Sequence, residues 1–227
     1  QYTGNVTISD ADAGDINATD INTIASATNG TITISNNVDI NGTAEAVATA
    51  VGNVDTYSKA AVTATLSNPH TLAELKTIND AIGGTLTLND YTVALSGTTA
   101  NVKAALAGTF ASTYTGNVTL SDANTTDITA TDITTVEGDT SGTVTVSNTI
   151  DINGSGSEVA AAFAAIDTNT GNATATVTGS DYTVSNLKSI NAATSGSITL
   201  SNTGVALSGT STNLAAAFAG TVTTHTG

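Results

Sequence analysis

Apolar and polar residues alternate with a period of two in eight short segments of the chain. In the segment 31–35 this alternation places Ile32 and Ile34 on one face of a strand and Thr31 and Thr33 on the other. Thr and Val are residues that favour such a pleated, half-buried surface. The pattern therefore predicts eight strands, over residues 5–9, 31–35, 62–66, 85–88, 117–121, 143–147, 174–178 and 197–201.

Apolar residues at helical spacing follow several of these strands. Val47, Val51 and Val54 lie at positions i, i+4 and i+7, on one face of a helix, and similar sets occur within 102–110, 159–166 and 214–222. Capping-box patterns at 71–74 and 155–158 support helix starts. Shorter helices are expected at 20–25, 72–82, 132–137 and 186–192, and second strands at 38–40, 92–95, 150–152 and 205–207.

The whole pattern is written twice, with an offset of 112 residues. Residues 2–10 return as 114–122 with a single change, Ile8 to Leu120. A long internal repeat is typical of stacked, quasi-one-dimensional proteins. We therefore expect two continuous modules of four coils each, at 1–115 and 116–227, with no linker between them.

The spacing of strands and helices suggests how such coils would stack. Neighbouring strands lie roughly 4.8 Å apart, whereas a helix is about 10 Å across. Full helices on every coil would splay the stack, so we expect long helices on alternate coils only. The predicted fold class is a repeat solenoid, mainly parallel β (a β-solenoid or β-helix), with short α-helices on one wall of alternate coils.

Composition excludes several functions. The chain has 19 acidic residues, four Lys and no Arg, which gives a net charge of −15. Binding to nucleic acid or to an anionic membrane surface needs clustered Lys and Arg, so neither is expected. The sequence has no apolar run of 18 residues, so membrane insertion is not expected. The absence of Cys excludes disulfides and thiolate metal sites.

Acidic loops provide the candidate for a cation site. Calcium takes about six to eight oxygen ligands from such loops. The helix-loop-helix calcium pattern does not fit, because Gly14 occupies its fifth position and Ile21 its last. Asp and Asn are also ordinary turn and cap residues, which is the alternative interpretation. The candidate calcium ligands are Asp10, Asp12 and Asp15 in the first copy and Asp122, Asn124 and Asp127 in the second.

The sequence has no catalytic motif and one pattern that suggests surface recognition. His70 and His225 do not recur at equivalent positions, and no nucleophile elbow, phosphate loop or zinc motif is present, so we expect no enzyme. Paired Thr-x-Thr residues on outward faces would form ladders of the kind that bind ice. The alternative is that Thr is simply a good exposed strand residue.

Two recurring motifs carry a resemblance. The segment 116–122 reads Gly-x-Val-Thr-Leu-Ser-Asp, and 208–218 reads Ser-Gly-Thr-x-x-x-Leu-Ala-Ala-Ala-Phe. Together they resemble tandem repeats of giant, acidic, cysteine-free bacterial surface proteins, including secreted adhesins and surface-layer-associated proteins. The resemblance implies secretion, a location outside the bacterial cell and a fibrous or adhesive role.

The leading functional prediction is a structural one. We expect a subunit or segment of an extracellular bacterial filament or surface fibre, which assembles by end-to-end coil stacking. Its partners would be copies of itself, as a head-to-tail homopolymer, or further repeats of the same chain. The alternative is an adhesin stalk or a ligand-binding repeat, stabilised by calcium or using its Thr ladders as a binding surface.

Overall fold

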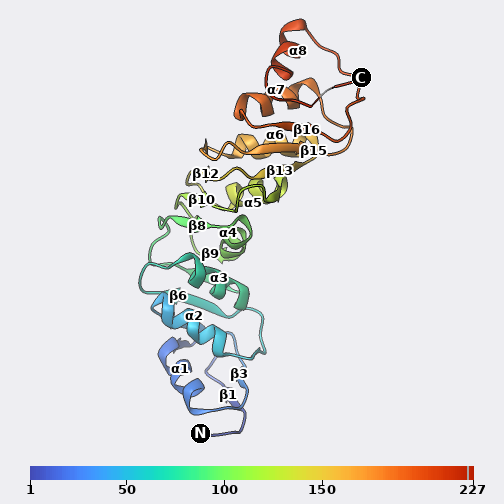
Figure 1. Ribbon diagram of the computed structural model, residues 1–227. Helices are drawn as coiled ribbons and strands as arrows, with labels where there is room; N and C mark the ends of the chain where they lie inside the picture. The colour runs from blue at the N-terminus through green and yellow to red at the C-terminus, as the bar shows by residue number, and fades with distance from the viewer. Residues whose placement is uncertain (224) are drawn as a thin grey trace. The chain divides into compact units, whose positions relative to one another are not determined.

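The computed structural model describes residues 1–223 and 225–227, and in them short parallel strands alternate with helices along the chain (Figure 1). These residues form four parallel sheets and eight helices. The fold is therefore α/β, and the prediction of a mainly β solenoid with helices on alternate coils is wrong. Every strand or group of strands is followed by a helix of seven to ten residues.

The chain divides into two compact units, and the first comprises residues 1–95 and 101–116. One of its sheets has three strands, in the order β1 (Val6–Ile8), β3 (Ile32–Ile34) and β5 (Thr56–Tyr57). The other has five, in the order β2 (Asp15–Asn17), β4 (Asp39–Gly42), β6 (Thr63–Leu66), β7 (Thr85–Thr87) and β9 (Thr109–Phe110). The helices in this part of the chain are α1 (Ala18–Ala27), α2 (Ala44–Asn53), α3 (Leu72–Ala81) and α4 (Thr99–Leu106).

The second unit comprises residues 96–100 and 117–227. Its first sheet has the order β14 (Thr168–Asn169), β12 (Val144–Val146), β10 (Val118–Leu120) and β8 (Leu95–Gly97). Its second sheet has the order β11 (Asp127–Thr129), β13 (Asp151–Gly154), β15 (Thr174–Val177) and β16 (Ile198–Leu200). The helices are α5 (Ala130–Asp139), α6 (Gly156–Ala165), α7 (Val184–Ala193) and α8 (Ser211–Ala217). The division into two repeat modules, 1–115 and 116–227, concerns the sequence repeat and stays a prediction.

The two copies of the sequence fold with the same strand register. Val6 pairs with Ile32 in the first copy, and Val118 pairs with Val144 at an offset of 112 in the second. The pairs β2–β4 and β11–β13 match in the same way. The repeat therefore specifies how each strand pairs as well as where it lies.

The eight predicted strands are confirmed, with boundaries shifted by a residue or two. Their apolar faces form the core, where Ile32 and Ile34 are 2 % and 0 % exposed. Helix α2 covers the core with Val47 and Val51 on one face, as its spacing predicts. The capping boxes beginning at Thr71 and Ser155 are also confirmed.

The expected difference between long and short helices is the main local error. Helices α1 and α5 have ten residues each, where the sequence predicted six. Thr and Asn within them have modest helix propensity, but packing decides the outcome. Ala18 and Ile21 of α1 are fully buried, and consecutive helices pack directly on one another, α1 on α2 and α2 on α3. The buried face therefore holds each helix over its full length.

A second local error concerns residues 205–207, which were predicted to form a strand and have no regular structure. The equivalent residues in the first copy lead into β8, which pairs with β10. There, the Ser121 amide donates to the Gly97 carbonyl at 2.8 Å. A strand needs a neighbouring strand for its backbone groups, and no strand of the described residues pairs with residues 205–207.

Glycines at close backbone contacts give a stability prediction. A Cβ at Gly171 would lie 2.0 Å from the Asn148 carbonyl oxygen, whereas a Cβ at Gly52 in α2 would meet nothing within 4 Å. We expect Gly171→Ala to lower the free energy of unfolding by about 1–3 kcal/mol, because backbone must move. Gly52→Ala should raise it by about 0.5–1 kcal/mol, because Ala favours the helix. Urea denaturation measures both, and equal effects would contradict the described packing.

Candidate functional site

The three candidate calcium ligands of the first copy lie near the start of the chain, in and after the loop that follows β1. Asp10 and Asp12 are exposed in this loop, whereas Asp15 begins β2 instead of lying in the loop. The Asp12 carboxylate accepts a hydrogen bond from the Asn37 amide at 2.9 Å, and the Asp10 carbonyl accepts one from the Asn36 side chain at 2.7 Å. Both hydrogen bonds therefore join this loop to the residues that follow β3.

The three candidates of the second copy behave similarly, with one difference. Asn124 Oδ1 accepts from the Thr149 amide at 2.9 Å, and Asp127 begins β11. Asp122 is only 5 % exposed, and its Oδ2 accepts from the backbone amide and the hydroxyl of Thr99 at 2.9 and 2.6 Å. Asp122 therefore holds the backbone at the start of α4.

These residues do not form one ligand cluster. Within residues 1–223 and 225–227, no group of three or more acidic or histidine side chains is placed to hold a metal ion. Asp15 lies beside Asp39 on the neighbouring strand, and Asp127 lies beside Asp151 in the same way. Calcium binding at the six candidates stays a prediction.

The repeated polar residues link neighbouring layers of the fold. Here a layer is one helix together with the strands that lie between it and the preceding helix in the sequence. A side-chain oxygen in one layer accepts a hydrogen bond from a backbone amide in the next or the previous layer. The same bond occurs in both copies: Asn5 with Thr31 (3.1 Å), Asn117 with Thr143 (3.0 Å), Asp55 with Ile32 (2.7 Å) and Asp167 with Val144 (2.8 Å).

Side-chain pairs on adjacent strands add to these links. The Thr63 hydroxyl donates to Asp39 Oδ1 at 2.8 Å, and the Thr174 hydroxyl donates to Asp151 Oδ1 at the same distance. A hydrogen bond to a charged group contributes about 1.5–3 kcal/mol in total, which is more than a hydrogen bond between neutral groups contributes. These repeated hydrogen bonds make the surface through which one layer joins the next the candidate functional site.

An aromatic residue at the start of the second copy belongs to this surface. Tyr114 is 1 % exposed, and its hydroxyl donates to the Val93 carbonyl at 2.5 Å. Its ring contacts His70 and Phe110, with centroids 5.9 and 6.0 Å away. Burial, with a smaller effect of the Asp90 charge, raises the pKa of the Tyr114 hydroxyl. The equivalent residue of the first copy, Tyr2, is 62 % exposed.

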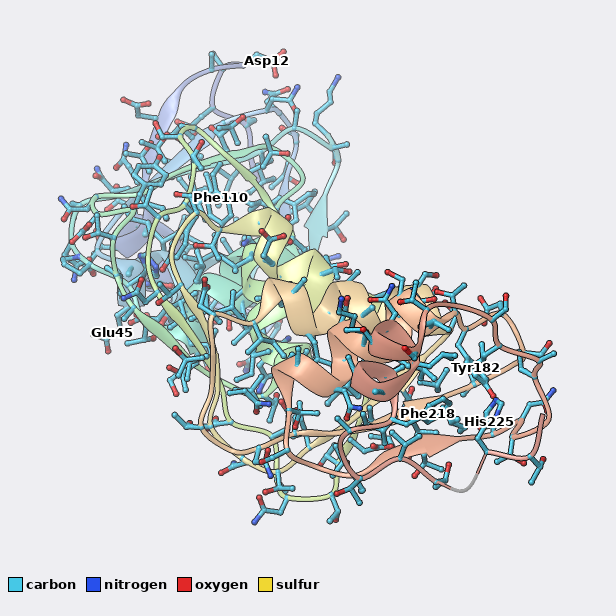
Figure 2. The ribbon with its side chains drawn as sticks, turned by 90° about the horizontal axis from the view of Figure 1, so that it is seen from above. Asp12, Glu45, Phe110, Tyr182, Phe218 and His225 are labelled. Atoms are coloured by element: carbon cyan, nitrogen blue, oxygen red, sulfur yellow. The ribbon has the colours of Figure 1, made fainter. Side chains whose placement is uncertain are left out.

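A related pair of rings lies near the end of the chain, with the two ring types exchanged. Tyr182 is the equivalent of His70 at the 112-residue offset, and His225 corresponds to Tyr114 at an offset of 111. Figure 2 shows Tyr182, Phe218 and His225 close together. The ring centroids of Tyr182 and His225 lie 6.3 Å apart, and Phe218 contacts His225 at 5.3 Å. Nε2 of His225 is buried without a hydrogen-bond partner.

His70 gives the chain a pH dependence. Its Nε2 lies 3.1 Å from the Tyr114 oxygen, and its Nδ1 is buried without a partner. Burial lowers the pKa of His70 from 6.5, although Glu74 and Asp90 act in the opposite direction. A lowered histidine pKa means that the unfolded chain binds more protons, so stability is full above pH 6.5 and falls as the pH drops below it.

We therefore expect the free energy of unfolding to decrease between pH 7.5 and 5.5, above the range in which most carboxylates titrate, by at most about 1.4 kcal/mol per pH unit from this group. His70→Gln should flatten this slope because it removes the titrating ring. Urea denaturation at a series of pH values provides the measurement. Equal slopes in the two proteins would show that His70 does not carry the effect.

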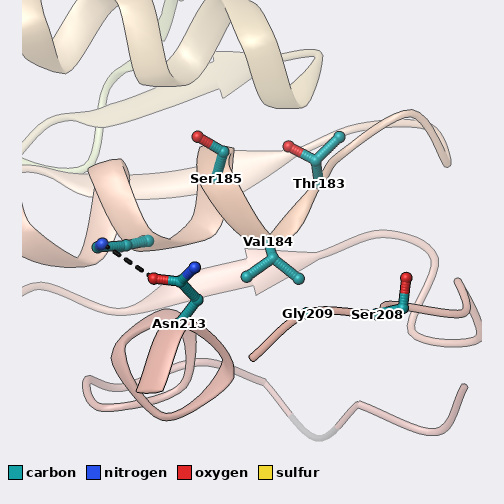
Figure 3. A pocket seen from close by; sticks show the side chains of 7 residues that line it. Thr183, Val184, Ser185, Ser208, Gly209 and Asn213 are labelled. Carbon is teal, nitrogen blue, oxygen red and sulfur yellow. Dashed lines mark hydrogen bonds between the residues drawn. The ribbon is translucent and has the colours of Figure 1, made fainter. Parts of the chain in front are cut away.

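The described surface has a pocket of about 340 Å³ near the start of α7 (Figure 3). Thr183, Ser185, Ser208 and Asn213 supply polar groups to its wall. Lys188 is its one cationic lining residue, and its Nζ donates to Asn213 Oδ1 at 3.2 Å. The pocket therefore offers hydroxyl and amide groups beside a lysine that is already hydrogen-bonded.

Comparison of the chain with protein families, with curated proteins and with solved structures gives no match. None of the helices in the described residues is long and apolar enough to cross a membrane. The function therefore has to be inferred from the chain itself.

The sequence drew attention to the acidic loops, but it did not reveal that their side chains form hydrogen bonds between layers. The signal was present, because Asn5 and Asp55 lie at fixed distances from strands and recur at Asn117 and Asp167. Their partners are backbone amides 23 or 26 residues away, and a side-chain pattern alone cannot show a backbone partner.

Proposed function

We propose that the chain is a structural segment of an extracellular bacterial filament or surface fibre, in which copies of the repeat are joined end to end. The observation that supports this role is the repetition of the layer contacts themselves. Strand register and the side-chain links between layers recur at the 112-residue offset. A sequence that repeats the contacts between its own layers can extend by adding layers.

Charge and composition support a location outside the cell. The net charge of −15 comes with only four cationic residues, and the chain contains no Cys. A net charge far from zero keeps an extended surface soluble. A fold that holds its layers with hydrogen bonds and apolar packing needs no disulfide in an oxidising environment.

Immunogold labelling of the cells that produce the protein tests this role. We expect gold particles outside the cell envelope, arranged along fibres or over the surface. Antibody against an abundant cytoplasmic protein provides the control for cell integrity. Label confined to the cell interior would contradict the proposal.

A ligand-binding surface is the second candidate, favoured by one observation. Polar residues on adjacent strands form continuous ladders in both copies: Asn17, Asn41, Thr65 and Thr87 in one, and Thr129, Asn153, Thr176 and Thr199 in the other. Parallel strands hold such rungs at a regular spacing of about 4.8 Å. Thermal hysteresis of a solution of the chain tests binding to ice, and freezing without hysteresis would exclude it.

A further inference from the structure

Three apolar side chains of the last layer are more exposed than their equivalents 112 residues earlier. Phe218 is 36 % exposed, and Leu207 and Leu214 are partly exposed. We call these three the trailing residues. Their equivalents are 2 % exposed or less, namely Leu95, Val102 and Leu106.

A matching difference exists at the first layer. Tyr2 is 62 % exposed, and Val6 and Ile24 are partly exposed. We call these three the leading residues. Their equivalents in the second copy are 1 % exposed or less, namely Tyr114, Val118 and Val136. Apolar residues that the repeat buries in one copy are thus uncovered in the other.

Backbone groups show the same relation. In the second unit the Ser121 amide donates to the Gly97 carbonyl, and β10 lies beside β8. The equivalents are Ser9, which follows β1, and Gly209, in the segment 205–210 that has no regular structure. Ile8 directs its carbonyl towards β3, where it accepts from the Ser35 amide. Successive residues of a parallel strand face opposite neighbours, so the Ser9 amide faces away from β3.

A polar pair completes the correspondence. The buried Asp122 carboxylate accepts from the amide and hydroxyl of Thr99. Its equivalent Asp10 is exposed, and Ser211, the equivalent of Thr99, is exposed and retains the hydroxyl. An Asp10–Ser211 contact would therefore repeat a contact that the chain already makes internally.

Building on the proposed structural role, we propose that a second copy of this chain docks with its β1 alongside residues 205–209 of the first. The Ser9 amide donates to the Gly209 carbonyl, Asp10 accepts from Ser211, and the leading residues cover the trailing residues. Because the two surfaces differ, each docked copy leaves another trailing surface open, and the contact propagates.

One segment of the receiving copy must move in this arrangement. Tyr2 of the incoming copy is the equivalent of Tyr114. His225 of the receiving copy also corresponds to Tyr114, because the Thr226 amide that follows it donates to the Thr203 carbonyl as the Thr115 amide donates to the Tyr91 carbonyl. His225 leaves its Nε2 buried without a partner, whereas Tyr114 has a carbonyl partner for its hydroxyl. Tyr2 therefore replaces His225 beside Tyr182 when the copies join.

Sedimentation velocity of the 227-residue chain over a range of concentrations tests the contact. We expect species larger than a dimer to form as concentration rises. Ser9→Pro removes the outward amide and should weaken self-association about tenfold or more, whereas Ser9→Ala, which keeps the amide, should not. Asp10→Ala should weaken association to a similar extent, and Asp20→Ala, with the same loss of charge on α1, should have little effect.

Removal of residues 225–227 provides a second, independent test of the contact. It takes away the segment that competes with Tyr2, so association should become tighter, by about tenfold for one aromatic contact. Circular dichroism and urea denaturation establish that each variant is folded. Self-association that is unchanged by Ser9→Pro, or weakened by the truncation, would overturn the contact.

The outcome is distinguishable from that of the proposed function. Extracellular immunogold label together with no effect of Ser9→Pro would leave the structural role in place and remove this contact. Label inside the cell together with a clear effect of Ser9→Pro would remove the extracellular role and leave the contact.

Discussion

Tyr114→Ala should lower the free energy of unfolding by about 3–5 kcal/mol, the range for truncating a buried aromatic side chain. The substitution removes a ring that contacts His70 and Phe110 and leaves the Val93 carbonyl without its donor. Urea denaturation at pH 7 provides the measurement.

Tyr2→Ala is the matched control because it makes the same change at the equivalent position of the first copy. Tyr2 is 62 % exposed, so its truncation should change stability by less than about 0.5 kcal/mol. Measurements belong at a protein concentration below that of self-association. Similar losses of stability in the two variants would contradict the described difference in burial between Tyr114 and Tyr2.

Asp122→Ala should also lower the free energy of unfolding, by about 1–3 kcal/mol. Its carboxylate is the acceptor for both the amide and the hydroxyl of Thr99, and all of these groups are buried. Without Asp122 the Thr99 amide keeps no acceptor in a place that water does not reach freely. The change is again followed by urea denaturation.

Asp10→Ala and Asp122→Asn provide the comparisons. Asp10 is exposed, so its loss should change the stability of the single chain by less than about 0.5 kcal/mol. Asp122→Asn keeps a carbonyl oxygen as acceptor and should lose only part of the stability. An Asp122→Ala protein as stable as the Asp10→Ala protein would contradict the role of this carboxylate.

The strands were the most predictable part of the fold. Alternation such as Thr31-Ile32-Thr33-Ile34 has one structural solution, and β3 forms there. Strands β2 and β11 escaped prediction because each is three residues long with one apolar residue, Ile16 or Ile128. A single apolar position has no period, so only pairing with β4 or β13 reveals such a strand.

The fold class was predicted wrongly for a physical reason. The argument from strand and helix spacing assumed that helices stack as regularly as strands. In the described residues, helices α1, α2 and α3 of three successive layers have ten residues each, and Ala18 in α1 and Ala44 in α2 are fully buried. Small residues on a helix allow close packing, which the spacing argument did not include.

The candidate site was predicted in part. The repeat drew attention to Asp122 and Asn124, but as ligands of a cation. The structure shows each accepting hydrogen bonds from the protein itself, Asp122 from Thr99 and Asn124 from Thr149. The partners of such bonds are set by the stacking of layers, which no local pattern contains.

Electron microscopy of the purified 227-residue chain is the most direct test of the claim that copies of this chain join end to end. The account predicts linear strings of chains at high protein concentration, which the Ser9→Pro protein does not form. Single particles at every concentration, from protein shown to be folded, would contradict it.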